Sequence, residues 1–145
     1  YYTMTTKTLL KNINIVNEGQ IFTADVLIDE GFIKKISPGI ETAGVQIIDG
    51  TGKYLFPGII DGQVHFREPG LTHKGDLYTE SKAAVAGGVT SFIDMPNTVP
   101  NVLTTELLYQ KYETAAKQSL ANFGFFLGVN GDNIDTITQL DTSDI

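Results

Sequence analysis

The composition of this 145-residue chain excludes several classes of protein. Ten Lys and Arg against seventeen Asp and Glu give a formal net charge of −7, whereas a sequence-independent nucleic-acid binder needs a basic face. The absence of Cys excludes a disulfide framework and a thiolate metal site, and it fits a reducing cytoplasm. No apolar run approaches the roughly 20 residues of a membrane span, so we expect a cytoplasmic protein with no membrane insertion.

Residues 5–56 are predicted to form a small N-terminal β domain. Short β segments at 9–16, 21–28, 32–36 and 45–48 are separated by turns such as Asn17-Glu18-Gly19 and Asp29-Glu30-Gly31. Strands joined in this way favour a small antiparallel sheet that covers one face only.

The pattern changes after Pro57, where strands predicted at 58–65, 89–95 and 123–129 alternate with helices. Asp76 is the candidate N-cap of the first helix, which ends at Gly87-Gly88, and Thr104 or Thr105 caps the second. A third helix begins near Ile134. Two helical faces are predicted to pack inward, namely Leu77, Ser81, Ala84 and Val85 in the first helix, and Leu108, Tyr112, Ala115 and Ala116 in the second. Repeated βα units imply parallel strands, in a doubly wound sheet or in a barrel that three units cannot close.

The densest group of chemically active side chains comes at the end of the first of these strands. Because side chains at i, i+2 and i+4 of a strand share a face, Gln63, His65 and Arg67 are predicted to project together. Barrel enzymes place their active sites at this end of the strands. An imidazole and a guanidinium suit an anion between them, such as a metal-bound hydroxide or a carboxylate substrate. The alternative is a loop His with Arg67 paired to Glu68.

The other polar residues of this region have simpler interpretations. Asn97 suits a turn between Pro96 and Pro100. Asp61 and Asp94 lie at or near strand ends and are predicted to be structural hydrogen-bond partners, and His73 is predicted to lie in an exposed loop.

The stretch 57–70 resembles the opening signature of dihydroorotases, in the amidohydrolase superfamily: Pro-Gly-x-Ile-Asp-x-His-x-His-x-Arg-x-Pro-Gly. The matching residues are Pro57, Gly58, Ile60, Asp61, His65, Arg67, Pro69 and Gly70. Residues 86–90 and 94–98 also resemble the second strand and loop of that family. The resemblance implies an α/β fold, with a small β-sandwich-type domain at 5–56. A partial TIM-like (β/α) barrel would follow at 57–145, and the chain would end before the barrel closes.

The resemblance also implies roles for individual residues. His65 matches a zinc ligand, and Arg67 and Asn97 match the pair that holds the substrate carboxylate. Gln63 stands where the first zinc-binding His is expected, and an amide oxygen is a weaker zinc donor than an imidazole. The cofactor would be one or two zinc ions. The remaining ligands and the general acid–base Asp of the family come from later strands, so no catalytic residue is expected within this chain.

The implied reaction is the reversible hydrolysis of dihydroorotate to N-carbamoyl-aspartate in pyrimidine biosynthesis. The enzyme would be a homo-oligomer, with aspartate transcarbamoylase as a candidate partner. A hydantoinase or allantoinase relative is one alternative, although Arg67 argues against it because those substrates lack the same carboxylate. A non-catalytic dihydroorotase-like scaffold subunit is the other, and Gln63 favours it.

Overall fold

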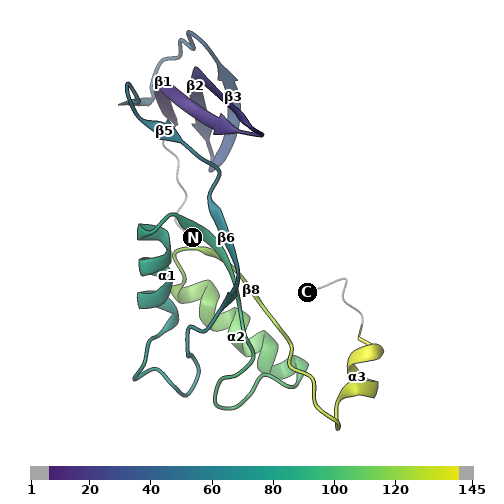
Figure 1. The fold of residues 1–145 in the computed structure, drawn as a ribbon. Helices are drawn as coiled ribbons and strands as arrows, with labels where there is room; N and C mark the ends of the chain where they lie inside the picture. The colour runs from purple at the N-terminus through teal and green to yellow at the C-terminus, as the bar shows by residue number, and fades with distance from the viewer. Residues whose placement is uncertain (1–6, 141–145) are drawn as a thin grey trace. The chain divides into compact units, whose positions relative to one another are not determined.

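The computed structural model describes residues 7–140 (Figure 1). The chain divides into two compact units, one ending at Pro57 and the other beginning at Gly58. The first unit holds only strands in its described part, and the second has an α/β fold. None of the helices between residues 7 and 140 is both long enough and apolar enough to cross a membrane.

The first unit is a five-stranded sheet. Its strands are β1 (Thr8–Asn17), β2 (Gln20–Asp29), β3 (Phe32–Ser37), β4 (Gln46–Asp49) and β5 (Tyr54–Leu55). The order is β3-β2-β1-β4, with β5 also paired to β1. The hairpin turns Glu18-Gly19 and Glu30-Gly31 have positive φ at both residues, the conformation that matches the twist of antiparallel strands.

The expectation of an antiparallel sheet is correct for three strands and wrong for the other two. β1, β2 and β3 pair antiparallel, whereas β4 and β5 run parallel to β1. The segment after β3 carries the chain across to the free edge of β1, and a crossover of this kind produces parallel pairing. No local turn signal in the sequence reports such a connection.

A buried carboxylate organises the first unit. Asp25 is 2% exposed, and it accepts the amide N–H of Asn12 at 2.9 Å and of Ile40 at 2.8 Å. The ammonium of Lys11 lies 2.9 Å from its second oxygen. The Asn12 amide, followed by the Lys11 ammonium, holds the pKa of Asp25 below its ordinary value. This carboxylate therefore joins the bulge in β1 at Asn12 to the loop at Ile40.

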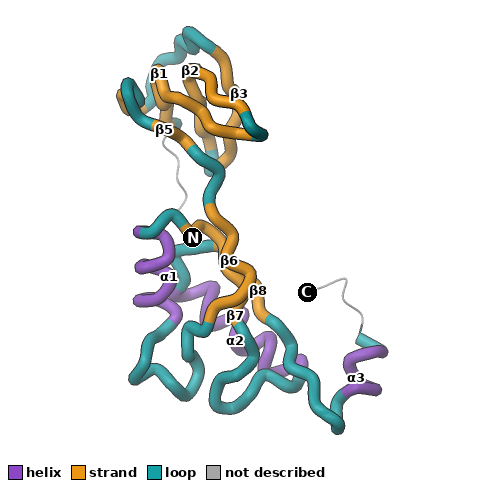
Figure 2. Tube along the Cα trace, in the orientation of Figure 1, coloured by secondary structure: helices purple, strands orange, loops and turns teal. Residues whose placement is uncertain are grey.

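The second unit has a three-stranded parallel sheet in the order β6-β7-β8. Its elements are β6 (Ile59–Val64), α1 (Leu77–Ala86), β7 (Val89–Asp94), α2 (Thr105–Gln118), β8 (Asn122–Phe125) and α3 (Ile134–Thr138). α1 packs on β7, α2 packs on β8, and the two helices contact each other, so both lie on one face of the sheet (Figure 2). The predicted parallel pairing of the second and third strands is confirmed.

Both long helices begin at the predicted caps. The Asp76 carboxylate accepts the N–H of Thr79 at 2.7 Å, which lowers the pKa of Asp76, and the Thr104 hydroxyl accepts the N–H of Leu107. α1 ends at Ala86 with Gly87 as its C-cap, and Gly88 follows with a φ of 90°, so the predicted stop at Gly87-Gly88 is also confirmed.

The core of the second unit is aromatic at its centre. Phe92 packs between Phe66 and Phe125, with ring centroids 4.4 and 6.4 Å away. The whole buried cluster consists of Phe66, Leu77, Phe92, Val102, Leu108, Ala115, Ala121 and Phe125.

Three details of the predicted packing are wrong. Val85 is 41% exposed and Ala116 is also exposed, because the inward faces of α1 and α2 are narrower than expected. β7 is fully buried only at Phe92 and Asp94, since the described helices cover one face of the sheet. β8 ends at Phe125, which pairs with the last residue of β7, so the ladder has no partner beyond this point.

Candidate functional site

The loops that follow β6 and β7 lie against each other at the carboxyl edge of the sheet. The amide of Met95 donates to the carbonyl of Val64 at 3.0 Å, and that of Val99 donates to the carbonyl of Pro69 at 3.2 Å. Gly70 has a φ of 82°, and a Cβ there would lie 2.1 Å from the Val99 carbonyl oxygen. Only glycine permits this approach, which brings the first loop beside the second.

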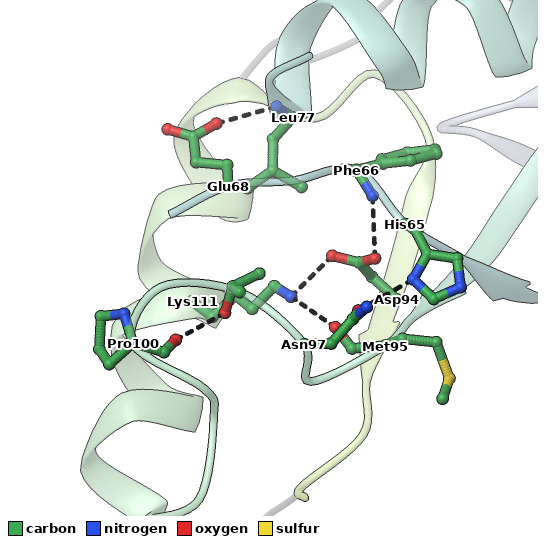
Figure 3. A network of polar contacts seen from close by, with 10 residues as sticks. His65, Phe66, Glu68, Leu77, Asp94, Met95, Asn97, Pro100 and Lys111 are labelled. Atoms are coloured by element: carbon green, nitrogen blue, oxygen red, sulfur yellow. Dashed lines mark hydrogen bonds and ion pairs between the residues drawn. The ribbon is translucent and has the colours of Figure 1, made fainter. Parts of the chain in front are cut away.

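His65 and Asn97 meet where these loops converge (Figure 3). The Nδ1 atom of His65 lies 2.9 Å from the Oδ1 atom of Asn97, and both residues are exposed. Because an amide oxygen can only accept, this contact is a hydrogen bond in the tautomer with the proton on Nδ1, and in that tautomer Nε2 presents its lone pair. The Asn97 Nδ2 group is left to donate elsewhere. The two residues predicted to serve metal and substrate therefore contact each other directly, which their separation in the sequence does not reveal.

Arg67 follows in the same loop and is half-buried, with a φ of 69°. It forms no ion pair with any residue between 7 and 140. Glu68 turns to the start of α1, where its Oε2 atom accepts the N–H of Leu77 at 2.8 Å. The alternative pairing of Arg67 with Glu68 is therefore wrong, because the unsatisfied N–H groups of a helix N-terminus attract the carboxylate.

Gln63 lies in an irregular part of β6. The pairing of β6 with β7 shifts register between Asp61 and Val64, and the backbone N–H of Gln63 donates to the Asp61 carboxylate at 3.1 Å. The strand then ends at Val64, so the strict alternation assumed for residues 63, 65 and 67 does not apply. Within the described residues no hydrogen bond joins Gln63 to His65. The metal roles of these two residues, and the carboxylate role of Arg67 and Asn97, stay predictions.

The metal-binding capacity of residues 7–140 is limited. Nowhere in this range do three His, Cys, Asp or Glu side chains gather as a metal site requires. At this edge of the sheet the candidate donors are the Nε2 atom of His65 and the amide oxygen of Gln63. These two would form part of a zinc site at most, because such sites use three or four protein ligands. His73 is exposed, as predicted.

A buried ion pair, Asp94–Lys111, contacts the backbone of both loops that carry the site residues. Asp94 accepts the N–H of Phe66 at 3.0 Å, which confirms its predicted structural role. Its Oδ2 atom lies 2.6 Å from the Nζ atom of Lys111 and has no other polar partner in the described part of the chain. Lys111 also donates to the carbonyl of Met95 at 3.2 Å, and it lies 4.9 Å from the ring centroid of Phe125. Both charged side chains are 1% exposed.

Lys111 was not among the residues predicted to matter, although the sequence contains a signal for it. It stands three residues after Leu108 and four before Ala115, on the face of the helix that packs inward. Asp94 is likewise a charged residue within a strand that is otherwise mostly apolar. Opposite charges at two core positions are rarely buried unless they pair with each other.

Curated proteins with similar sequences include two dihydroorotases and an allantoinase. The dihydroorotase of Carboxydothermus hydrogenoformans is 50% identical over 103 residues, which are 70% of this chain and 24% of that protein. The dihydroorotase of Methanosarcina mazei is 39% identical over 132 residues, 90% of this chain and 29% of that protein. The allantoinase of Desulfitobacterium hafniense strain DCB-2 is 38% identical over 133 residues, 91% of this chain and 30% of that protein.

Solved structures with similar folds are hydantoinases and dihydropyrimidinases. The L-hydantoinase (dihydropyrimidinase) of Arthrobacter aurescens has a TM-score of 0.85 and 29% identity, covering 92% of this chain and 30% of that protein. The dihydropyrimidinase of Brevibacillus agri has a TM-score of 0.78 and 29% identity, covering 92% of this chain and 29% of that protein. No protein-family model matches the chain.

The chain therefore spans 24 to 30% of the length of these relatives. Their names are all those of cyclic amide hydrolases. Over most of its own length, this chain resembles dihydroorotases in sequence and the hydantoinases of the same amidohydrolase superfamily in fold.

Proposed function

We propose that the complete protein is a dihydroorotase-like, metal-dependent hydrolase that reversibly hydrolyses dihydroorotate to N-carbamoyl-aspartate. The observation that carries this proposal is the contact of His65 with Asn97 at the carboxyl edge of the sheet, with Arg67 in the same loop. This contact supports the proposal because it joins a side chain of a metal-binding type to an amide that can also donate to a carboxylate, and Arg67 follows two residues after His65. The 50% identity to a dihydroorotase supports the same reaction.

The proposal includes the architecture of the whole enzyme. Residues 57–145 would be the first βα units of a TIM-like barrel, and residues 5–56 would belong to a separate sandwich-type domain. The sequential parallel order β6-β7-β8 supports this, because barrels are built in that way. In the described part of the chain, β6 and β8 each have a free edge at which further strands would pair.

Zinc is the proposed cofactor, as one or two ions. Bound zinc would supply a coordinated water of lowered pKa and a positive charge that polarises the ring carbonyl. His65 would contribute its Nε2 lone pair, and Gln63 would contribute its amide oxygen or bind a water. Because the residues present form only part of a zinc site, the other ligands must come from elsewhere in the protein.

Substrate orientation is the part of the mechanism that this chain's own residues would perform. The Arg67 guanidinium would bind the substrate carboxylate with two parallel N–H donors. Asn97 would accept a hydrogen bond from His65 through Oδ1 and donate to the same carboxylate through Nδ2. The side-chain amide of Asn97 would then contact both the substrate carboxylate and the imidazole of His65. It would thereby hold the substrate at a fixed distance and orientation relative to that imidazole.

A hydantoinase or allantoinase activity is the second candidate, favoured by the allantoinase match and by the structural neighbours. Arg67 separates the two candidates, because a guanidinium in this loop suits a substrate with a carboxylate. The non-catalytic scaffold subunit is supported by Gln63 alone, and we do not favour it.

The experiment compares ring opening of dihydroorotate, hydantoin and allantoin by the full-length protein. We expect turnover of dihydroorotate. Asn97→Ala should raise its KM about tenfold to a hundredfold, the loss of one charge-assisted hydrogen bond, and Arg67→Ala, which removes two such donors, should raise it at least as much. Lys74→Ala removes an exposed cation from the segment between β6 and α1 and should leave KM unchanged. Unchanged kcat/KM in both site variants would refute the carboxylate assignment. A protein without metal and without turnover of any of the three substrates would be the scaffold.

We further propose a cytoplasmic homo-oligomer, with aspartate transcarbamoylase as a candidate partner. The class of the relatives is the support for this. Light scattering of the full-length protein, alone and mixed with that enzyme, tests both associations.

A further inference from the structure

We propose that the buried pair Asp94–Lys111 has a positioning role. It holds the loop that carries His65 and Arg67 at a fixed place relative to the loop that carries Asn97. The proposal rests on the function proposed above, because it assigns these residues a role in arranging that site. Neither Asp94 nor Lys111 would touch the substrate.

The first arm of the pair holds the loop after β6. The Asp94 Oδ1 atom accepts the N–H of Phe66 at 3.0 Å, and Phe66 is the residue between His65 and Arg67 (Figure 3). This bond fixes the backbone from which both site residues project. Arg67 lies in the left-handed region with a φ of 69°, a conformation that needs support from its surroundings in a residue other than glycine.

The second arm holds the loop after β7. The Lys111 Nζ atom donates to the carbonyl of Met95 at 3.2 Å, and Met95 lies two residues before Asn97. The same ammonium lies 2.6 Å from Asp94 Oδ2. One charged group on α2 is therefore connected to both loops, to one through the Asp94 carboxylate and to the other through a carbonyl. The 2.9 Å contact of His65 with Asn97 lies between the two arms.

Stability alone does not account for this pair. Removing two charges from water costs several kcal/mol per ion, and well-packed apolar residues of similar volume often serve stability as well or better. At 1% exposure, both Asp94 and Lys111 bear the full cost of this transfer. A positioning role explains what the pair supplies that a Leu–Met pair could not, namely an acceptor for Phe66 and a donor for Met95.

The test compares two double variants of the full-length protein with the wild type. D94L/K111M removes the charges and also the acceptor of the Phe66 N–H. D94N/K111M removes the charges and keeps that acceptor, at the cost of a buried amide donor without a partner. Each variant thus leaves one buried donor without a partner, the Phe66 N–H in D94L/K111M and the introduced NH₂ group in D94N/K111M, so we expect similar melting temperatures but higher activity in D94N/K111M. A purely structural role would give two variants of equal stability equal activity.

Hydrogen exchange provides a readout that does not depend on activity. In D94L/K111M the Phe66 amide should exchange faster by about an order of magnitude, the equivalent of one lost hydrogen bond. In D94N/K111M it should stay protected. The Phe126 amide is the internal control, because it donates at 3.1 Å to the backbone carbonyl of Asp94, which neither variant removes. Its exchange should not change.

The kinetic expectation is a loss of about a hundredfold in kcat/KM for D94L/K111M, as for a site displaced by roughly 1 Å, and a smaller loss in D94N/K111M, which keeps the acceptor of Phe66 but not the Lys111 donor to Met95. Wild-type kcat/KM together with a protected Phe66 amide in D94L/K111M would overturn the proposal. If D94L/K111M does not fold, Asp94→Asn decides, since it keeps the acceptor: a protected Phe66 amide supports the proposal and a fast one overturns it. If the wild type opens none of the three cyclic amides, the proposed function fails, and the exchange of Phe66 against Phe126 still decides whether the pair positions the loop.

Discussion

Asp25→Asn should destabilise the first unit locally and strongly. The carboxylate accepts two backbone N–H groups and pairs with Lys11, whereas an asparagine would direct its own NH₂ group at one of these donors. Breaking a buried ion pair by removing one partner costs roughly 3–5 kcal/mol. Lys11 is 31% exposed and can regain water, so the lower end, about 3 kcal/mol, applies here.

Native-state hydrogen exchange of the full-length protein measures this cost as the opening free energy of amides in β1 and β2. Asp49→Asn is the matched control. The pKa of Asp49 is also lowered, by hydrogen bonds from Thr51, but its carboxylate is exposed to solvent. We expect no change in β1 and β2 for this control. A loss below about 1 kcal/mol in Asp25→Asn, no more than one ordinary hydrogen bond, would refute the role given to Asp25.

The same carboxylate gives the wild type a defined response to acid. Because the folded-state pKa of Asp25 is lowered, its stabilisation is fully present above the unfolded pKa of about 3.9. It is lost as the pH falls through the folded-state pKa. The difference in opening free energy between the wild type and Asp25→Asn should therefore shrink below about pH 4 and stay constant from there to neutrality. A difference that stays unchanged in acid would contradict this assignment.

Two further predictions concern the site. Gln63→His should keep or raise the zinc content of the full-length protein, measured by atomic emission, because imidazole is the better zinc donor; a fall in zinc content would show that the pocket is shaped for the amide. Gly70→Ala should lower the melting temperature and reduce kcat/KM, since its Cβ would collide with the Val99 carbonyl, whereas Gly62→Ala, where a Cβ meets nothing within 4 Å, should be neutral. Equal melting temperatures for these two variants would contradict the close approach of the loops.

The sequence predicts the elements of the second unit well because their signals are local. Asp76 and Thr104 are helix caps that act within three residues, and Gly87-Gly88 ends a helix through its own backbone. Parallel pairing then follows from the alternation of strands and helices. The shortened end of β8 could not be predicted in this way, since it depends on where β7 stops.

The sequence proposes residues for the site but not their geometry. Residue type and resemblance point to His65, Arg67 and Asn97, whose roles stay predictions, and the contact of His65 with Asn97 comes only from the structure. The orientation expected for Gln63 assumed a regular strand, and the register shift before Val64 removes that assumption. A bulge of this kind is set by pairing with a neighbouring strand, which a single strand's pattern does not record.

The contacts of Lys111 restrict how the length of this protein can vary. Each residue added to an α-helix turns everything beyond it by about 100°. One residue inserted between the Thr104 cap and Lys111 would move the ammonium off the sheet-facing side of α2 and leave Asp94 without its counter-charge. Insertions should therefore be accepted only beyond the buried Ala115, toward the exposed end of α2 near Lys117, and rejected before it. In this way α2, which contributes no residue to the site, would fix the number of residues that the chain can have between the Thr104 cap and Lys111.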